Sequence, residues 1–426
     1  MVVRNYLPVA GTWGGDVIVL ELIEFLAHAG VVVEFVSLNH RPNEIPWVKL
    51  APTFDNTVDV RAPSNQKVSS RLVRTSPVAW SIFTERYLAS RLPTIASKCI
   101  SKIRPASRIG KALGEFRVKE YSEIPTNSDV AFISREIKRF RPDVLIVDYA
   151  WLGSLFWKVQ DLSRVLKIVL GHEAIHLRAA ALTKAGMALD LPNWDCETEV
   201  QHLHAADVVL LETSEEVAAM SRLLCGKTVL SVPRGLPFKQ RGIFRVKGRC
   251  LFVGSNAVPN VCGLRWFLTD VWPLVLRNIP FATLEVCGKV CELFKGESYP
   301  SVDFVGQVPT LAPNYEVAAL CVMPLLAGSG FKTKLIEALS YGCACVSTPA
   351  GASGADAIVG EAVFVAQSPE DFAGSIVNVL KNDAVRIKME SAATIYAKEN
   401  LTPDSTFRPL LDLIRSHLLR MNGKNS

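Results

Sequence analysis

The chain has 426 residues, of which 49% are hydrophobic and 21% charged, and its formal net charge is +6. This balance is typical of a globular protein with two or more domains and excludes a disordered chain. No uninterrupted run of 18 apolar residues occurs, and the first residues lack the apolar core of a signal peptide, so neither a spanning helix nor a leader is expected. The ten cysteines follow no framework spacing, which predicts reduced thiols in a cytoplasmic protein.

The first predicted elements follow the order strand, glycine loop, helix and strand over residues 6–38. Gly14 and Gly15 open the predicted helix, and Gly30 ends it. A glycine pair between a strand and a helix either forms a plain tight turn or lets a ligand approach the backbone closely. Because the spacing is not GxGxxG, no classical dinucleotide-binding fingerprint is present.

Residues 46–127 show no clear alternation of elements and are rich in basic side chains. Between Arg61 and Arg141 there are 17 Lys or Arg and 6 Asp or Glu, an excess of 11. Such a segment is either an ordinary solvated surface or a patch that meets an anionic membrane surface or an anionic acceptor. No recognised nucleic-acid module accompanies the charge, so a nucleic-acid partner is not expected.

Apolar runs typical of buried strands return after residue 141. The run 142–148 ends at Asp148, and the run 167–171 leads into His172. Asp148 either caps a helix or faces a ligand, and His172 is either a core or capping histidine or a ligand contact. Strands at 207–211 and 229–233 and a helix at 214–224 complete the first half, and a linker is predicted at 235–242.

The second half repeats this alternation more regularly. Alternating strands and helices are typical of parallel sheets with helices on both faces. We therefore predict an α/β protein of two doubly wound, Rossmann-like domains facing a cleft, where such sheets bind ligands. The predicted domains are residues 1–236 and 237–400, with a helix in residues 401–426 packing back on the first domain. The predicted strands of this half are 250–253, 282–286, 302–305, 319–323, 343–347 and 362–365. Its first predicted helix ends at about residue 276, and the others span 332–341, 369–380, 384–399 and 406–419.

The stretch 321–354 carries the clearest functional pattern. Lys332 and Lys334 stand at the start of a predicted helix, where a cation opposes the helix dipole. A bound anion would make this position favourable for the two lysines, because backbone amides, the helix dipole and both ammonium groups would all converge on the anion. Glu337 follows Lys334 by three residues and lies on nearly the same face, where a carboxylate suits the hydroxyls of a ribose. The pattern predicts half of a nucleoside-diphosphate site; the alternative is an exposed ion pair.

Five segments of the second half resemble, in order, the C-terminal domain of GT-B glycosyltransferases, and the first half does so more loosely. The resemblance is to the retaining "group 1" or family 4 type. It implies transfer of a sugar from a nucleotide-sugar donor to a hydroxyl of a glycan, lipid-linked or small-molecule acceptor. Retention of anomeric configuration is implied, with no metal and no other cofactor. The cysteines add the expectation of a cytoplasmic protein, and the basic segment between Arg61 and Arg141, if it is not an ordinary solvated surface, that of peripheral contact at the inner membrane face. The segments are LFVGSNAVPNVCGLRWF, LEVCGK, VDFVGQV, CVMPLLAGSGFKTKLIEALSYGCACVSTPAGASG and GEAVFVAQSPEDFAGSIVNVL.

The resemblance also assigns roles to single residues. Glu337 matches the second glutamate of the E-x7-E motif and would hydrogen-bond the donor ribose, while Lys332 and Lys334 match a basic pair that would meet the diphosphate. With His172, which matches a histidine beside the donor sugar, Lys334 and Glu337 form the expected catalytic set. The other expected donor contacts are a glycine near the phosphate, the first loop of the second domain, backbone near the base, and the loop before the lysines: Gly15, Gly254, Ser255, Val308, Ser329 and Gly330.

Two positions depart from the family pattern. The first glutamate of E-x7-E falls on Ser329, so a sugar contact there would use a hydroxyl or backbone amides. The family's lysine after the first strand of this domain falls near Asn260 and Val261. Both departures shift the expected cationic support of the phosphates to Lys332 and Lys334.

Two other functions remain compatible with parts of the sequence. Residues 172–176 read HExxH, and Glu197 follows at a spacing close to that of zinc metalloproteases, with Glu173 as the base. That chemistry needs both histidines on one helix face, whereas a predicted strand runs directly into His172. The second alternative is a non-catalytic nucleotide-sugar-binding protein of the same fold, which the loss of charge at Ser329 permits.

Overall fold

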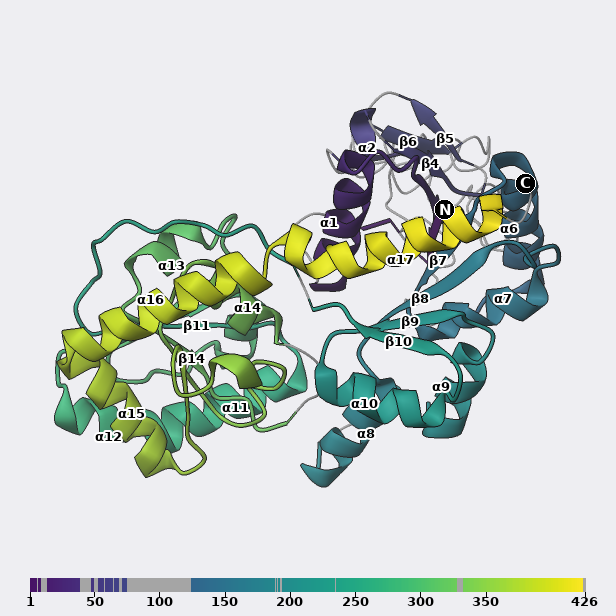
Figure 1. Ribbon diagram of the computed structural model, residues 1–426. Coiled ribbons are helices and arrows are strands. Elements are labelled where there is room, and N and C mark those ends of the chain that lie inside the picture. Colours follow the sequence, from purple (N-terminus) through teal and green to yellow (C-terminus); the bar gives the residue numbers. More distant parts are fainter. Residues whose placement is uncertain are drawn as a thin grey trace, which may run out of the picture. The chain divides into compact units, whose positions relative to one another are not determined.

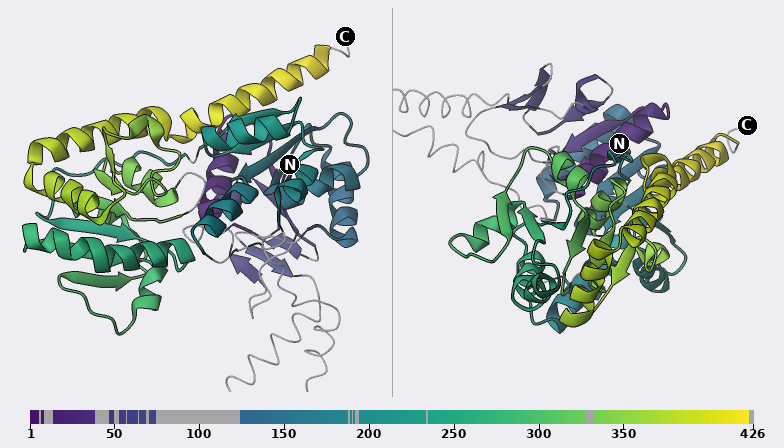
Figure 2. Two further views of the ribbon diagram at one scale, coloured as in Figure 1. Left: turned by 90° about the horizontal axis from the view of Figure 1, so that it is seen from below. Right: turned by 90° about the vertical axis from the view of Figure 1, so that its left-hand side faces the viewer.

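The computed structural model describes residues 1–5, 7–8, 14–38, 47–49, 53–56, 58–63, 65–68, 71–74, 124–187, 189, 191, 194–233, 235–327 and 332–423. The chain divides into two compact units, one of residues 1–171, 201–209 and 413–426 and one of residues 172–200 and 210–412. The elements are labelled in Figure 1, and Figure 2 gives two further views. Among the described helices, none combines the length and apolar composition that crossing a membrane would require.

The first parallel sheet has the strand order β10-β9-β8-β7-β1-β2-β4. Its neighbouring strands β1–β2, β1–β7, β2–β4 and β7–β8 pair in parallel. The sequence order of the strands reverses direction at β1, which is the topology of a doubly wound sheet. The strands are β1 (Val2–Arg4), β2 (Glu34–Ser37), β4 (Asp59–Arg61), β7 (Val144–Asp148), β8 (Leu166–His172), β9 (Val208–Leu211) and β10 (Thr228–Ser231).

The helices of this part begin and end where local chemistry favours it. The helix α6 (Asn127–Phe140) begins with a capping box, in which Thr126 and Asp129 satisfy each other's backbone amides, and it ends at Arg141 in a left-handed conformation. Pro142 follows, which prevents the helix from continuing. The others are α1 (Gly14–His28), α2 (Thr53–Asn56), η1 (Ala150–Ser154), α7 (Leu155–Lys158), α8 (Ile175–Lys184), α9 (Cys196–Leu203) and α10 (Ser214–Leu223).

A small antiparallel sheet was not predicted. It consists of β3 (Trp47–Lys49), β5 (Asn65–Val68) and β6 (Arg71–Arg74) in the order β3-β6-β5. Strands of three or four residues are too short to show a period of two, and the segment WVK offers no alternation at all. The sequence therefore gave no signal for these strands.

The second parallel sheet has the order β13-β12-β11-β14-β15-β16, and each of its five neighbouring pairs is parallel. All six predicted strands of this half are present, with ends shifted by up to two residues. They are β11 (Arg249–Val253), β12 (Thr283–Cys287), β13 (Val302–Gly306), β14 (Leu320–Met323), β15 (Cys345–Ser347) and β16 (Val363–Val365).

Helices cover both faces of this second sheet (Figures 1 and 2). Alternate residues of β11 show the division, since Cys250 and Phe252 pack in one core and Leu251 and Val253 in the other. The central strands β11, β14 and β15 are buried on both faces and read as nearly continuous apolar runs, which explains why they were predictable. The first core includes residues of α11 (Val258–Trp266), η2 (Phe267–Val271), α12 (Trp272–Asn278) and α15 (Pro369–Lys381), and the second includes residues of α13 (Ala312–Val317), α14 (Thr333–Ser340) and α16 (Asp383–Asn400).

Three remaining elements complete the described chain. They are η3 (Lys289–Phe294), η4 (Asp356–Ile358) and α17 (Pro403–Gly423). The predicted last helix is thus present and begins three residues earlier than expected, at a proline, which suits the first turn of a helix. Together the two parallel sheets confirm the prediction of two doubly wound, Rossmann-like α/β folds.

Candidate functional site

Three glycines lie side by side where β11, β12 and β13 end. The amide of Gly254 donates to the carbonyl of Cys287 at 3.0 Å, and the amide of Gly288 donates to the carbonyl of Gly306 at 2.7 Å. Gly288 has φ +103°, and a Cβ built there would lie 2.2 Å from the carbonyl oxygen of Gly254. No side chain fits at position 288. The backbones of three neighbouring strand ends therefore pack directly against one another at this edge of the sheet. Val308 follows β13 at the same edge and is half-buried.

The first loop of this sheet is held by its own side chains. Ser255 Oγ accepts a hydrogen bond from Asn260 Nδ2 at 2.9 Å. Asn260, near the position where the resemblance would place a lysine, thus fixes the loop. Along α11, a Cβ at Gly263 would lie 2.3 Å from the carbonyl oxygen of Pro324, so this helix passes against the loop that follows β14.

The loop after β14 is also anchored by the turn after β15. Thr348 Oγ1 donates to the carbonyl of Leu325 and accepts from the amide of Gly351 at 3.1 Å. Ser347 Oγ donates to the carbonyl of Met323 at 3.2 Å. The start of the loop is thus fixed from two sides. Its next part, residues 328–331 with the predicted contacts Ser329 and Gly330, lies outside the described residues.

The helix α14 begins at the carboxyl edge of the sheet, as predicted. Lys332 is its N-cap residue, and its carbonyl accepts from the amides of Leu335 and Ile336 at 2.8 and 3.0 Å. Leu335 and Ile336 are buried in the core and orient the helix. Burial lowers the pKa of the Lys332 ammonium to about 8. The charges of Glu173, Glu216 and Glu212 oppose this shift, so the ammonium already faces carboxylates.

Lys334 and Glu337 lie together on α14, as their spacing predicted. Lys334 Nζ is 2.7 Å from Glu337 Oε2, and their side chains are 36% and 21% exposed. Partial exposure leaves both groups accessible to a ligand. An ion pair this exposed contributes little to stability, about 0.2–1 kcal/mol.

A third residue at this position was missed by the sequence analysis. The hydroxyl of Tyr315, on α13, donates to Glu337 Oε2 at 3.3 Å. Tyr315 is fully buried and stacks on Tyr341 with 4.8 Å between ring centroids. Burial, reinforced by the charge of Glu337, raises the pKa of Tyr315 well above its usual value, so its hydroxyl keeps its proton and remains a donor. Tyr315 thereby fixes the orientation of the Glu337 carboxylate.

His172 ends β8 in a left-handed conformation with φ +62°. It is buried, and its Nδ1 lies 3.8 Å from Glu212 Oε1. Nearby, Glu216 accepts from the amide of Ala174 at 3.0 Å and from Thr213 Oγ1 at 2.8 Å. Burial raises the pKa of Glu216 to about 7. A left-handed backbone conformation at a non-glycine residue costs on the order of 1 kcal/mol of strain, and residues strained in this way are common at functional sites.

The HExxH sequence does not assemble a zinc site. His172 ends a strand, whereas His176 lies in the first turn of α8, so the two are not on one helix face. His176 Nδ1 lies 2.7 Å from Glu199 Oε2, and the Glu199 carboxylate also accepts from the amides of Ile175 and His176, each at 2.9 Å. Glu199 therefore caps α8, and Glu197 is exposed. In the described part of the chain no group of three potential ligands could hold a metal ion.

Asp148 is engaged in a buried ion pair. Arg4 Nε is 2.7 Å from Asp148 Oδ2, and Arg4 Nη2 is 2.9 Å from Asp16 Oδ1, with all three side chains at most 1% exposed. Asp148 is thus paired with a buried arginine and does not present a free carboxylate. Gly14 and Gly15 open α1 as predicted, one residue before Asp16. Arg4, Gly14, Gly15, Asp16 and Asp148 all belong to the first unit. The residues at the carboxyl edge of the second sheet belong to the second unit.

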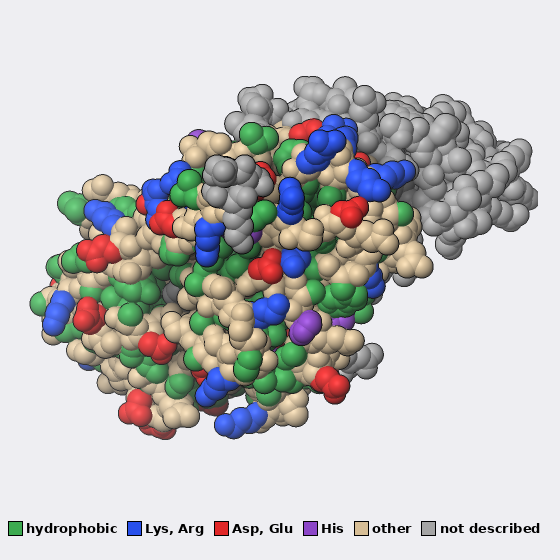
Figure 3. Space-filling model, turned by 45° about the vertical axis from the view of Figure 1, so that its right-hand side comes forward, with side chains coloured by type: hydrophobic (Ala, Val, Ile, Leu, Met, Phe, Trp, Pro, Cys, Tyr) green, Lys and Arg blue, Asp and Glu red, His purple; other side chains and the backbone are tan. Residues whose placement is uncertain are grey.

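Nine of the 17 basic residues counted between Arg61 and Arg141 lie in residues 75–123, outside the described residues. On the face shown in Figure 3, the described Lys and Arg side chains are interspersed with Asp and Glu.

Comparison with known proteins matches the part of the chain that contains the second parallel sheet to a family. Residues 247–382 match the family described as Glycosyl transferases group 1. A curated relative from Klebsiella pneumoniae, described as an uncharacterized 44.6 kDa protein in the cps region, is 27% identical over 187 residues. That match covers 41% of this chain and 48% of the relative, so the chain spans about half the length of the curated relative it matches.

Solved structures resemble the chain over nearly its whole length. Sucrose-phosphate synthase from Thermosynechococcus elongatus has a TM-score of 0.64 with 16% identity, covering 98% of each chain. Anabaena HepE, solved with UDP and glucose, has a TM-score of 0.57 with 10% identity, covering 97% of this chain and 99% of its own. The fold is the GT-B fold, as predicted, and its second sheet lies in the region matched to Glycosyl transferases group 1.

Proposed function

We propose that this protein is a retaining, metal-independent glycosyltransferase that moves a hexosyl group from a nucleoside diphosphate sugar to an acceptor hydroxyl. The observation that carries the proposal is the placement of Lys332, Lys334 and Glu337 at the start of α14, beside the carboxyl ends of the parallel strands. Ligands of open α/β sheets bind at this edge. Two cations, a helix N-terminus and an adjacent carboxylate match a diphosphate followed by a ribose. The UDP bound to Anabaena HepE is consistent with such a donor.

In this proposal each residue has a separate task. Lys332 and Lys334 neutralise the diphosphate, and Glu337 accepts hydrogen bonds from the ribose hydroxyls. His172 lies beside the donor sugar. The remaining donor contacts are made through backbone and hydroxyl groups at Gly15, Gly254, Ser255, Val308, Ser329 and Gly330.

Catalysis in this scheme comes from stabilising the leaving group. Negative charge grows on the diphosphate as the bond to the anomeric carbon breaks, and the two ammonium groups and the amides at the start of α14 stabilise that charge. The acceptor hydroxyl then attacks an oxocarbenium-like sugar from the face that the diphosphate leaves, and the departing phosphate takes the proton. Configuration is thereby retained. Because lysines supply the positive charge, no metal ion is needed.

The acceptor is a hydroxyl of a glycan, lipid-linked or small-molecule substrate. The basic excess between Arg61 and Arg141 would hold an anionic or lipid-linked acceptor at the inner membrane face. A cytoplasmic location accords with a nucleotide-sugar donor.

Screening the full chain against a panel of nucleoside diphosphate sugars tests the proposal. We expect one donor to raise the melting temperature and to be hydrolysed slowly without acceptor, equally well after treatment with EDTA. Glu337→Ala should weaken binding of the corresponding nucleoside diphosphate. Failure to bind any donor, or loss of turnover in EDTA, would contradict the proposal. Binding without turnover, with or without an acceptor, would favour the non-catalytic alternative, and the anomeric configuration of the product decides retention.

The hydroxyl of Tyr315 is expected to strengthen donor binding through Glu337. Tyr315→Phe removes the hydrogen bond to the Glu337 carboxylate while keeping the buried ring. Because a hydrogen bond to a charged group contributes about 1.5–3 kcal/mol at normal length, and this one is long, we expect an affinity loss of about three- to tenfold. Titration of nucleoside diphosphate by calorimetry measures it.

Tyr341→Phe is the matched control for that experiment. In the wild-type chain the Tyr341 hydroxyl accepts a hydrogen bond from Lys239 Nζ at 3.1 Å, and the Tyr341 ring stacks on Tyr315. It should leave affinity unchanged. In a Glu337→Gln background Tyr315→Phe should have little further effect, since the two residues act as a unit. An equal loss in both backgrounds would show that Tyr315 acts through packing instead.

A further inference from the structure

One buried arginine contacts the ends of two helices in the second unit. Arg241 lies in the segment 235–242, which was predicted as a linker, and its side chain is 2% exposed. Its Nη1 donates to the carbonyls of Tyr315 and Ala318 at 3.0 and 3.1 Å, at the end of α13. Its Nη2 donates to the carbonyl of Gly342 at 2.6 Å, just beyond α14. Arg241 therefore bridges the C-terminal ends of both helices.

A cation suits these two helix ends. The last carbonyls of a helix have no partner within the helix and carry the negative end of its dipole. At the end of α14 the amide of Cys343 donates to the carbonyl of Ala338 at 3.0 Å, around Gly342 with φ +65°, which is a Schellman-type turn. The carbonyl of Gly342 itself accepts from Arg241. Because a guanidinium presents its donors in a fixed planar fork, the groups that it binds are also fixed relative to one another.

The same two helices carry the contact that orients the proposed donor carboxylate. The hydroxyl of Tyr315, on α13, donates to Glu337 Oε2, on α14, at 3.3 Å. This distance is long for a bond between two oxygens, so a shift of α13 against α14 by about half an ångström would break it. Tyr315 is thus held at two points, by Arg241 at its carbonyl and by Glu337 at its hydroxyl.

We propose that Arg241 is a positioning residue of the donor site, which holds α13 against α14 so that the Tyr315 hydroxyl stays on Glu337. This role rests on the proposed function, in which Glu337 binds the ribose of the donor. Arg241 acts through Tyr315 and touches no part of the donor. The segment 235–242 then does more than connect two parts of the chain, because one of its side chains sets the geometry of the site.

Arg241 also pairs with Glu390, but that carboxylate does not depend on it. Arg241 Nη2 lies 3.1 Å from Glu390 Oε1, and Arg245 Nε and Arg386 Nη1 lie 3.0 and 3.1 Å from the same oxygen. Two cations remain when Arg241 is replaced, so no carboxylate is left uncompensated and the variants are expected to fold. Among the described residues, the hydrogen bonds of Arg386 go to Asp383 and Glu390. Arg386→Met therefore disturbs the same charge cluster without touching either helix end.

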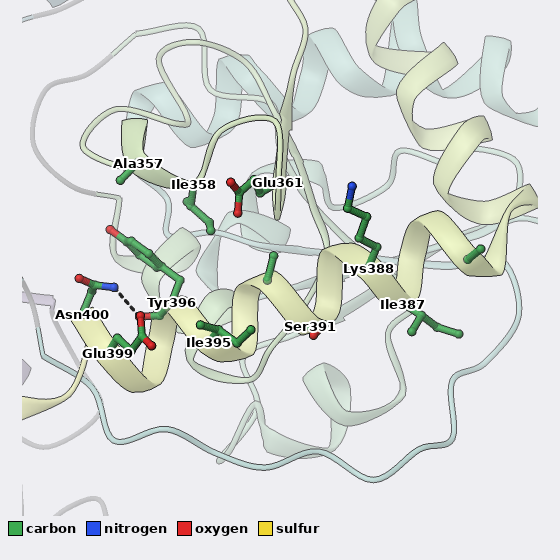
Figure 4. A pocket seen from close by; sticks show the side chains of 12 residues that line it. Ala357, Ile358, Glu361, Ile387, Lys388, Ser391, Ile395, Tyr396, Glu399 and Asn400 are labelled. Atoms are coloured by element: carbon green, nitrogen blue, oxygen red, sulfur yellow. Dashed lines mark hydrogen bonds between the residues drawn. The ribbon is translucent and has the colours of Figure 1, made fainter.

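A second control comes from the opposite side of α16. Lys388 is two residues from Glu390, which places the two side chains about 200° apart around the helix. Figure 4 shows Lys388 in the lining of an open groove with a volume of about 750 Å³. Lys388→Met removes a cation from this helix at a place remote from the Glu390 cluster.

Calorimetric titration with UDP, GDP and ADP tests the proposal. For the diphosphate that the wild-type chain binds, Arg241→Lys should lower the affinity about three- to tenfold, as expected for Tyr315→Phe. Lysine keeps the charge beside Glu390, but one ammonium cannot occupy the positions of both Nη1 and Nη2. Arg386→Met and Lys388→Met should leave the affinity unchanged. In a Tyr315→Phe background Arg241→Lys should have little further effect, because both changes act on one hydrogen bond.

Hydrogen exchange of the ligand-free chain tests the contact between the helices without a donor. Arg241→Lys should speed amide exchange in the last turns of α13 and α14, and Arg386→Met should not. Unchanged exchange at both helix ends, wild-type affinity in Arg241→Lys, or an equal loss of affinity in both Tyr315 backgrounds would overturn the proposal. If the wild-type chain binds none of the three diphosphates, the proposed function fails, and the role of Arg241 in donor binding fails with it.

Discussion

Replacing Lys334 by alanine is expected to lower donor turnover about 10- to 100-fold, because a charge-assisted hydrogen bond contributes about 1.5–3 kcal/mol. Lys334 Nζ lies 2.7 Å from Glu337 and is 36% exposed, so it can reach a diphosphate at the start of α14. If it stabilises the charge that grows on the leaving group, the loss falls mainly on kcat. Steady-state kinetics with the donor identified by screening measures it.

The matched control is Lys381→Ala, which removes an exposed lysine from the last turn of α15. That variant should keep wild-type kinetics. Lys334→Arg should retain part of the activity, since it keeps the charge but changes its geometry. Unchanged turnover in Lys334→Ala, at normal stability, would remove this lysine from the proposed mechanism.

Replacing Arg4 by methionine is expected to cost about 3–5 kcal/mol of the free energy of unfolding. Arg4 is the shared partner of Asp16 and Asp148, and the three side chains are at most 1% exposed. Methionine fills a similar volume but leaves two buried carboxylates without their cation. Since native domains are stable by only about 5–15 kcal/mol, this single change approaches the whole margin. Urea unfolding followed by circular dichroism measures it.

An exposed ion pair of the same type provides the comparison. Arg61 Nη2 lies 2.9 Å from Asp59 Oδ2, with side chains 44% and 46% exposed. Arg61→Met should cost less than about 1 kcal/mol, because solvent screens both charges. If Arg4→Met costs no more than Arg61→Met, the buried carboxylates are not held in place by Arg4.

The parts of the fold that were predictable are those that follow from local patterns. The central strands β11, β14 and β15 of the second sheet are buried on both faces and appear in the sequence as apolar runs. The Lys334–Glu337 pair was predictable because residues three apart on a helix are neighbours. Both inferences need only the chain near the residues concerned.

The rest depends on which distant segments the topology brings together. Tyr315 and Glu337 are 22 residues apart, and their contact requires α13 and α14 to lie on the same face of one sheet. Arg4 and Asp148 are 144 positions apart, and they meet because β1 pairs with β7. Glu199 is also brought in by the topology: it contacts His176 from another helix. Because of this contact the HExxH sequence forms a helix cap and not a metal site. No spacing rule encodes such contacts.

The closeness of Gly288 to the carbonyl of Gly254 has an evolutionary consequence. Position 288 combines a left-handed φ with a gap too narrow for a methyl group, so even alanine, the smallest change, meets two separate obstacles. Lys334 and Glu337 of α14 are 36% and 21% exposed, so a substitution there meets neither obstacle. Position 288 has no such freedom. As descendants of this sequence diverge, that glycine should be retained longer than the residues of α14 to which we assign donor binding.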